Sequence, residues 1–184
     1  MLPDGHQFFE YKSNRELAEG ISKKLKLLGI AHRITVPETN VDNFLAGRVA
    51  RMNDNNTDLP KRVVSIHSNA GPVKNPSKDW GNWTGIETWF RYKDKESMRM
   101  AEVFQRHLIE HTGERDRGIK SRLISQFYIF RKVKKAIPIV MTENLFYNNP
   151  VELKKLETRE KKEEIIDAHV AAIMEIEGRL LLNN

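Results

Sequence analysis

Cysteine is absent from the 184 residues of this sequence. Its absence excludes disulfide bonds, thiolate catalysis and any metal site with cysteine ligands. A metal ion would therefore need histidine, aspartate or glutamate side chains as ligands. Long hydrophobic runs are absent as well, because no apolar stretch approaches the roughly 20 residues that a helix needs to cross a bilayer. We therefore expect no membrane span.

The N-terminal residues 1–12 also lack the apolar segment that a signal peptide requires. The excess of positive charge is modest: 31 Lys and Arg residues against 25 Asp and Glu residues give a net charge of +6. Such a surface attracts anions of many kinds, including nucleic acid and cell-wall polymers. The basic residues are interleaved with acidic ones and form no continuous stripe, so we expect no nucleic-acid partner.

The sequence does contain an alternation of helix-like and strand-like segments, which predicts an α/β protein. With 39% hydrophobic residues the chain can form a packed core, and we expect residues 1–184 to be a single domain. The expected architecture has three layers (αβα), with a central mixed, mostly parallel sheet flanked by helices. An α/β unit usually opens on a strand, whereas the first segment here is helical, so we expect the domain to be N-terminally incomplete.

The expected elements follow from hydrophobic spacing and from turn-forming residues. Ser13 and Glu16 have the spacing of a capping box, and apolar residues follow at helical spacing as far as Leu28. The stretch 68–84 is rich in Gly, Pro, Asn and Ser and is expected to be a loop. Further helices are expected at 44–52, at 101–108 and in the C-terminal part, and strands at 31–36, 62–66, 85–91, 127–133 and 137–141.

Three side chains are candidates for a functional site. His67 and Glu143 are each expected to close an apolar strand, a stiff support from which a side chain projects into a cleft. A carboxylate delivered in this way suits a general base with a raised pKa. Glu10 lies beside two aromatic residues and is expected to be partly buried. Each residue also has a structural interpretation: a hydrogen-bonded histidine for His67, a salt-bridged or capping glutamate for Glu143, and a charge favoured by a helix N-terminus for Glu10.

A second histidine pattern competes with these residues. His107, Glu110 and His111 match the H-x-x-E-H pattern of inverted zincins, in which two histidines on one helix face bind a metal. The pattern is short and occurs by chance, and apolar residues supply the inward face of this helix. We therefore favour a position for these histidines beside that face or towards solvent. The remaining histidines are expected at the surface (His6 and His32) or in helix packing (His169).

Four segments occur in a fixed order: Asp4-Gly-His-Gln-Phe-Phe-Glu10-Tyr, Ser65-Ile-His67-Ser-Asn-Ala, Asp116-Arg-Gly-Ile-Lys120 and Val140-Met-Thr-Glu143-Asn-Leu-Phe-Tyr-Asn148. Together they resemble the N-acetylmuramoyl-L-alanine amidases of the AmiC/CwlV type (amidase family 3), and the segment that starts at Gly85 is similar to a strand of that family. The resemblance extends from about Asp4 to the final helix. The combination of segments is more specific than any one of them.

The resemblance implies a role for each candidate residue. It implies that Glu10 and His67 are metal ligands and that Glu143 is the catalytic glutamate. The implied cofactor is one Zn²⁺ ion, which polarises the scissile carbonyl and lowers the pKa of a bound water, while the glutamate moves the proton. The implied reaction cleaves the bond between the lactyl group of N-acetylmuramic acid and L-alanine in peptidoglycan. The resemblance also implies that Asn69, Arg117 and Lys120 line the substrate groove.

Peptidoglycan is thus the implied partner, and the implied target is a cell wall, periplasmic or extracellular, reached by an autolysin or an endolysin. The family begins with a strand ending in D-x-G-H-G, whose histidine is the first zinc ligand. Nothing in this sequence lies far enough upstream of Glu10 to match that motif, and His6 leaves no room for a strand before it. Because a catalytic zinc normally has three protein ligands, the alternative is a catalytically inert or binding-only remnant of the fold.

Overall fold

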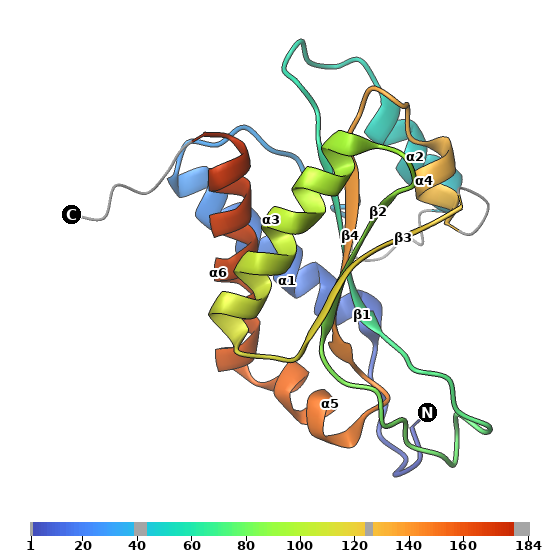
Figure 1. Ribbon diagram of the computed structural model, residues 1–184. Coiled ribbons are helices and arrows are strands. Elements are labelled where there is room, and N and C mark those ends of the chain that lie inside the picture. The colour runs from blue at the N-terminus through green and yellow to red at the C-terminus, as the bar shows by residue number, and fades with distance from the viewer. Residues whose placement is uncertain (1, 39–43, 124–126, 179–184) are drawn as a thin grey trace.

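A four-stranded sheet lies at the centre of the computed structural model, which describes residues 2–38, 44–123 and 127–178 (Figure 1). The strands are β1 (Val63–Asn69), β2 (Ile86–Arg91), β3 (Asp116–Arg122) and β4 (Ile139–Phe146), and their order in the sheet is β1-β4-β2-β3. β1 pairs with β4, and β2 with β3, in parallel, whereas β2 and β4 are antiparallel. The predicted mixed, mostly parallel sheet is therefore confirmed.

Helices cover both faces of this sheet (Figure 1). Side chains of α1, α3 and α6 pack with β2 and β4 residues such as Ile86 and Val140 on one face. Side chains of α2 and α4 pack with Trp89 and Met141 on the other. No helix in the described part of the chain is both long and apolar enough to cross a membrane. The helices are α1 (Glu10–Leu27), α2 (Leu45–Asn53), α3 (Lys95–Thr112), α4 (Tyr128–Lys132), α5 (Pro150–Glu157) and α6 (Arg159–Ile176).

The alternation of side chains along β2 separates the two faces. Ile86 and Thr88 point into the core formed with α3, where Thr88 donates a hydrogen bond to Gln105. Glu87 and Trp89 point to the opposite face, and the indole N–H of Trp89 donates to Glu87. The face that carries Glu87 is thus partly polar, while the face towards α3 and α6 is mostly hydrophobic and buries a few hydrogen-bonded polar side chains.

His169 lies in that core, as predicted for a histidine in helix packing. It is fully buried, with its ring 5.6 Å from the ring of Phe104 and its Nε2 3.0 Å from the hydroxyl of Thr142. Burial lowers its pKa to about 4. His169 is therefore a neutral packing residue at neutral pH.

The capping-box prediction was wrong. α1 begins at Glu10, three residues before Ser13, and its N-cap residue Phe9 makes no side-chain cap hydrogen bond. Ser13 is buried in the first turns, on the same face as Leu17 and Ile21, because that face packs against α6 and β1. The predicted apolar face of the helix was confirmed, and its start places the Glu10 carboxylate at the helix N-terminus, where the helix dipole favours a negative charge.

Two predicted strands do not form. Residues 127–133 contain α4, because the spacing of Ile129, Phe130 and Val133 suits one helical turn packed under Trp89. Residues 31–36 have no ladder partner and belong to no strand in the described part of the chain. A strand needs a hydrogen-bonded neighbour, and a cavity separates these residues from β1.

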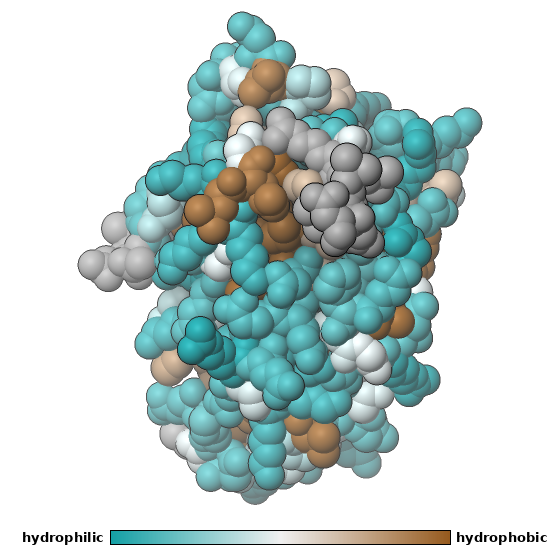
Figure 2. Space-filling model, turned by 90° about the vertical axis from the view of Figure 1, so that its left-hand side faces the viewer, coloured by the Kyte–Doolittle hydropathy of each residue, from teal (hydrophilic) through white to brown (hydrophobic). Residues whose placement is uncertain are grey.

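This cavity has a volume of about 600 Å³ and lies beside β1, which has a ladder partner, β4, on one side only among the described residues. Apolar side chains such as Ile34, Val64 and Ile173 line it, and Glu10 and His67 lie along the same lining. The side of the molecule seen in Figure 2 is mostly hydrophilic, with hydrophobic residues gathered chiefly in a hollow of its upper half. β1 is therefore an edge strand of the sheet in the described part of the chain.

Candidate functional site

Three charged side chains form a row across neighbouring strands. His67 of β1 is the register partner of Glu143 of β4, and Glu143 is the register partner of Glu87 of β2. Register partners on adjacent strands direct their side chains to the same face, about 5 Å apart. The three residues, which are far apart in sequence, therefore lie in one line on the face of the sheet that also carries Trp89.

Neither His67 nor Glu143 closes its strand, contrary to the prediction. β1 continues to Asn69, and β4 continues to Phe146. The register between the two strands shifts after His67, and Leu145 has a positive φ of 65°. Such a bulge bends a strand and redirects its side chains. The row thus lies just before an irregularity in the sheet, and the two strands run past the site and continue beyond it.

Glu10 joins the row from the N-terminus of α1. Its carboxylate oxygen Oε1 lies 3.0 Å from His67 Nδ1 and accepts a hydrogen bond from the amide of Asn14 at 3.0 Å. On the other side of the ring, His67 Nε2 lies 3.1 Å from the Ser65 hydroxyl. Both ring nitrogens of His67 therefore have defined partners, which fixes the orientation of the ring.

The contact between Glu10 and His67 favours their charged forms. Burial raises the pKa of Glu10, but hydrogen bonds from His67 and Asn14 outweigh burial and leave this pKa lowered. Burial lowers the pKa of His67, but the hydrogen bond to Glu10 and the negative charge of Glu143 leave it raised.

Glu143 differs from its neighbours because no described residue donates a hydrogen bond to its carboxylate. Burial raises its pKa to about 7, and the nearby charges of Glu10 and Glu87 add to this rise while His67 opposes it. A carboxyl group with this pKa exchanges its proton readily at neutral pH. The predicted rise in the pKa of Glu143 is therefore present in the structure.

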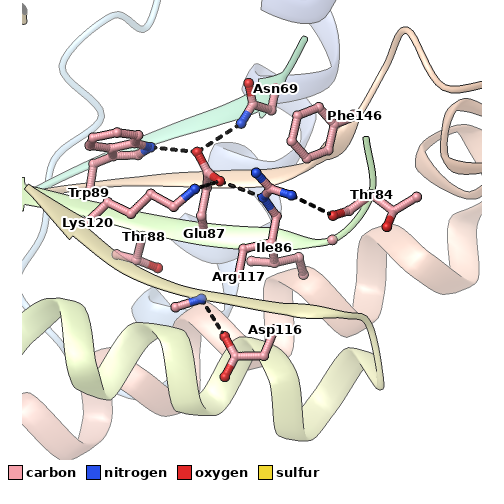
Figure 3. Close-up of polar contacts among 12 residues, drawn as sticks. Asn69, Thr84, Ile86, Glu87, Thr88, Trp89, Asp116, Arg117, Lys120 and Phe146 are labelled. Atoms are coloured by element: carbon pink, nitrogen blue, oxygen red, sulfur yellow. Dashed lines mark hydrogen bonds and ion pairs between the residues drawn. The ribbon is translucent and has the colours of Figure 1, made fainter. Parts of the chain in front are cut away.

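Glu87 was not among the predicted site residues, yet it is the most heavily bonded carboxylate of the row (Figure 3). It is 4% exposed, and its Oε1 accepts hydrogen bonds from Trp89 Nε1 at 2.9 Å and Asn69 Nδ2 at 3.1 Å. Its Oε2 accepts from Arg117 Nε at 2.6 Å and from the ammonium group of Lys120. The available signal was a lone carboxylate among the otherwise uncharged residues 86–90, which implies a buried partner of opposite charge.

Asn69, Arg117 and Lys120, the residues expected to line a substrate groove, are brought together by Glu87. The guanidinium of Arg117 also lies over the rings of Trp83 and Phe146, 5.1 and 4.9 Å from their centroids. Burial raises the pKa of Glu87, but Lys120 and Arg117 outweigh burial and leave this pKa lowered. Glu87 is therefore a carboxylate that stays ionised between two cations.

Other histidines lie away from this row. His6 pairs with Glu157 at 2.7 Å, and His107 pairs with Glu175 at 2.8 Å. His111 Nδ1 contacts the carbonyl oxygen of His107. The described residues contain no group of three or more His, Asp or Glu side chains that could hold a metal. The histidines of the inverted-zincin pattern thus contact Glu175 and the helix backbone. Glu10 and His67 are the contacting pair at the row whose side chains are of types that bind zinc.

The curated relatives of this chain are amidases. N-acetylmuramoyl-L-alanine amidase LytC of Bacillus subtilis is 29% identical over 168 residues, which cover 89% of this chain and 30% of LytC. An uncharacterized cell wall amidase of Bacillus anthracis is 31% identical over 148 residues, which cover 76% of this chain and 25% of that protein. The chain thus spans less than a third of the length of each of these relatives.

Solved structures share the fold. The N-acetylmuramoyl-L-alanine amidase of Clostridium difficile 630 superposes with a TM-score of 0.78 at 23% identity, covering 97% of this chain and 89% of that one. The catalytic domain of CwlV, from Bacillus (Paenibacillus) polymyxa var. colistinus, gives a TM-score of 0.78 at 21% identity, covering 95% of this chain and 88% of that one. At these identities the likeness shows the same α/β fold.

The family description of N-acetylmuramoyl-L-alanine amidase (amidase family 3) matches residues 4–175, a range that includes every residue of the row and its partners. This match agrees with the resemblance seen in the four sequence segments. The chain therefore belongs to the N-acetylmuramoyl-L-alanine amidase family of enzymes.

Proposed function

We propose that this chain hydrolyses the amide bond between N-acetylmuramic acid and L-alanine in peptidoglycan, with Glu143 as the catalytic glutamate. The family match supports the reaction class. The observation that carries the proposal is the combination, in one row, of an unbonded carboxyl group with a pKa of about 7 and the contacting pair His67 and Glu10. We further propose that residues 1–184 act as one catalytic domain on a cell-wall target.

In this mechanism Glu143 moves the proton. Its carboxylate removes a proton from the attacking water and returns it to the amide nitrogen of L-alanine as the C–N bond breaks. The raised pKa supports both steps, because a carboxyl group with a pKa near the working pH accepts and releases a proton with little cost. Burial is the largest cause of this raised pKa, because it disfavours the charged form of the carboxyl group.

We propose Glu10 and His67 as ligands of one Zn²⁺ ion. Both are donor types that zinc accepts, and the 3.0 Å between Glu10 Oε1 and His67 Nδ1 is close to the ~3.3 Å that separates two ligands of a tetrahedral zinc ion. Ser65 and Asn14 support their orientation as outer partners. When bound, the ion supplies Lewis-acid polarisation of the carbonyl and activation of water.

The donor set is incomplete, however, among the described residues, because no third ligand lies beside this pair. Stoichiometric zinc is therefore the measurement that separates the proposed enzyme from a binding-only protein. We expect metal analysis of the purified chain to find zinc that is lost in Glu10→Ala and in His67→Ala. The matched control is His107→Ala, which alters a histidine outside the row and should retain the metal. Zinc that is lost in His107→Ala but retained in Glu10→Ala and His67→Ala would refute the proposed ligands.

The reaction itself is tested by release of muropeptides from purified peptidoglycan with zinc present. We expect Glu143→Gln to lower the rate by about 10²- to 10⁴-fold, the usual contribution of a general acid–base group. Gln keeps the size of the side chain but cannot take the proton. The exposed Glu96→Gln on α3 is the control for loss of one carboxylate. Full activity of Glu143→Gln would exclude Glu143 as the proton carrier.

A further inference from the structure

The Glu87 cluster contains more positive than negative charge. One buried carboxylate is shared by the guanidinium of Arg117 and the ammonium of Lys120. Among these three groups one positive charge is left uncompensated. A buried or half-buried cluster with surplus charge attracts an ion of opposite sign, because the low local dielectric strengthens the interaction. The cluster therefore favours an anionic group of a ligand.

Glu87 divides its two oxygens between neutral and charged donors (Figure 3). Oε1 accepts from the neutral donors Trp89 and Asn69. Oε2 accepts from the cations Arg117 and Lys120. The neutral hydrogen bonds fix the carboxylate in place, and the fixed carboxylate then holds the two cations on the same side of the sheet as Glu143.

Arg117 is held rigidly but keeps a free donor. Its Nε donates to Glu87, one terminal nitrogen donates to the carbonyl oxygen of Thr84 at 3.3 Å, and the guanidinium plane lies against Trp83 and Phe146. The other terminal nitrogen has no partner among the described residues. Lys120 is 30% exposed at its side chain, so its ammonium group has access to solvent. Both cations thus keep donors that a ligand can use.

We propose that Glu87 is a positioning residue that holds Arg117 and Lys120 as a binding site for a carboxylate of the peptide substrate. This inference rests on the proposed function. A rigid guanidinium beside an ammonium is well suited to a carboxylate, which accepts two charge-assisted hydrogen bonds. Arg117 and Lys120 belong to β3, which β2 separates from the β4 strand of Glu143.

The strand spacing indicates where this carboxylate lies in the substrate. The two cationic groups contact the Glu87 carboxylate, and Glu87 lies one strand spacing, about 5 Å, from its register partner Glu143. An extended peptide covers at most ~3.3–3.6 Å per residue. A peptide whose first amide is at Glu143 therefore reaches the two cations with its second residue. The site selects peptides that carry a free carboxylate there over peptides that carry a carboxamide.

The test uses two synthetic lactyl-L-alanyl peptides that differ only in a free carboxylate or a carboxamide on the residue after L-alanine. Binding is followed by tryptophan fluorescence, which needs no catalysis, and hydrolysis is followed separately as kcat and KM. We expect the wild type to bind the carboxylate peptide about 10-fold more tightly. In Glu87→Gln this preference should fall to about 2-fold or less, with the loss in hydrolysis appearing mainly in KM.

Two further variants separate positioning from folding. Glu87→Asp keeps the charge and should retain part of the preference. Lys120→Gln leaves Glu87 in place, changes a side chain that is partly exposed, and should lose most of the preference even if Glu87→Gln fails to fold. Glu96→Gln is the control for charge removal elsewhere and should keep the full preference.

Equal binding of the two peptides by the wild type would overturn the proposal, and so would a full preference in folded Glu87→Gln or in Lys120→Gln. Failure of the proposed function gives a different result, since the carboxylate preference would then remain in the binding assay while neither peptide is hydrolysed.

Discussion

At the scale of single residues, Glu143 and Glu87 show how environment separates two carboxylates on neighbouring strands. Glu143 has no described hydrogen-bond donor, and burial raises its pKa to about 7. Glu87 is 4% exposed, but its contacts with Lys120 and Arg117 outweigh burial and leave its pKa lowered. One carboxyl group is therefore available for proton transfer, while the other remains a fixed negative charge.

This difference gives Glu143 a measurable effect on stability. Its pKa rises from 4.5 in the unfolded chain to about 7 in the folded protein, so between these values the folded state holds a proton that the unfolded state has lost. Stability contributed by Glu143 is therefore present below pH 4.5 and is lost as the pH rises through 7. In metal-free protein we expect Glu143→Gln to match the wild type near pH 4 and to exceed it by about 1–3 kcal/mol at pH 8.

Urea unfolding of both proteins at several pH values measures this difference. Glutamine is the suitable replacement because it resembles the protonated glutamate and does not titrate. A difference between the two proteins that stays constant from pH 4 to pH 8 would contradict the raised pKa.

The sequence was informative about single residues where a motif identified them. Glu10, His67 and Glu143 were predicted as a group, and the structure places them in contact or in register. Glu87 was missed because its importance depends on β3, and the pairing of β2 with β3 is not visible in local spacing. The partners of Glu87 on β1 and β3 are distant from it in sequence, so the residue pattern of β2 alone did not identify Glu87 as a site residue.

At the scale of elements, the backbone of Gly85, at the start of β2, lies close to the backbone of Arg115, and this contact helps to position β2 and its Glu87. Gly85 has a φ of +99°, and its N–H donates to the carboxylate of Glu152 at 2.7 Å. A Cβ at this position would lie 2.3 Å from the carbonyl oxygen of Arg115. The turn into β2 therefore requires glycine both for its backbone angle and for space.

We expect Gly85→Ala to lower the free energy of unfolding by more than about 2 kcal/mol, because it combines backbone strain with a steric clash. Gly113, the C-cap of α3, is the matched control. It also has a positive φ, 63°, but nothing lies within 4 Å of a Cβ there, so Gly113→Ala should cost only about 1 kcal/mol. Thermal or urea unfolding gives both values, and an equal cost at the two sites would show that the clash at Gly85 is relieved.

The packing of α6 against the sheet has its own pH dependence, through His169. The folded-state pKa of about 4 is below the unfolded value of 6.5, so the unfolded chain binds the proton more readily. Stability from the neutral histidine is thus present above pH 6.5 and is lost as the pH falls towards 4. We expect the wild-type advantage over His169→Gln to shrink by about 1–3 kcal/mol across this window. Urea titrations at pH 8, 6 and 4.5 measure this change, and an advantage that is constant with pH would argue against a buried neutral ring.

The type of an element could be predicted where apolar residues recur at helical spacing over several turns, as in α1 and α3. It was not predictable where an element depends on its neighbours. Residues 127–133 have the composition of a strand but pack as the short helix α4 under Trp89. Residues 31–36 also have the composition of a strand, but they lie across the cavity from β1 and pair with no strand among the described residues. Tertiary contacts decided both cases.

At the scale of the whole molecule, the net charge of +6 acts over longer distances than the contacts in the site. A basic protein is attracted to anionic cell-wall material, and salt screens this attraction over a Debye length of about 10 Å at 0.1 M. We expect binding to purified cell walls, measured by co-sedimentation, to weaken several-fold between 0.05 and 0.5 M NaCl. Hydrolysis of a small neutral substrate should change much less, and equal salt dependence of the two would argue against electrostatic attraction to the wall.

The row that joins β1, β4 and β2 also has a consequence for refolding. Its residues come from segments that are far apart in the chain, and β1 meets β4 only when Val63 pairs with Ile139. Closing such a long loop is slow, whereas helices such as α1 and α3 form from local contacts within about a microsecond. A refolding chain should therefore regain most of its helical circular dichroism before its catalytic rate, and recovered activity is a strict measure of complete folding.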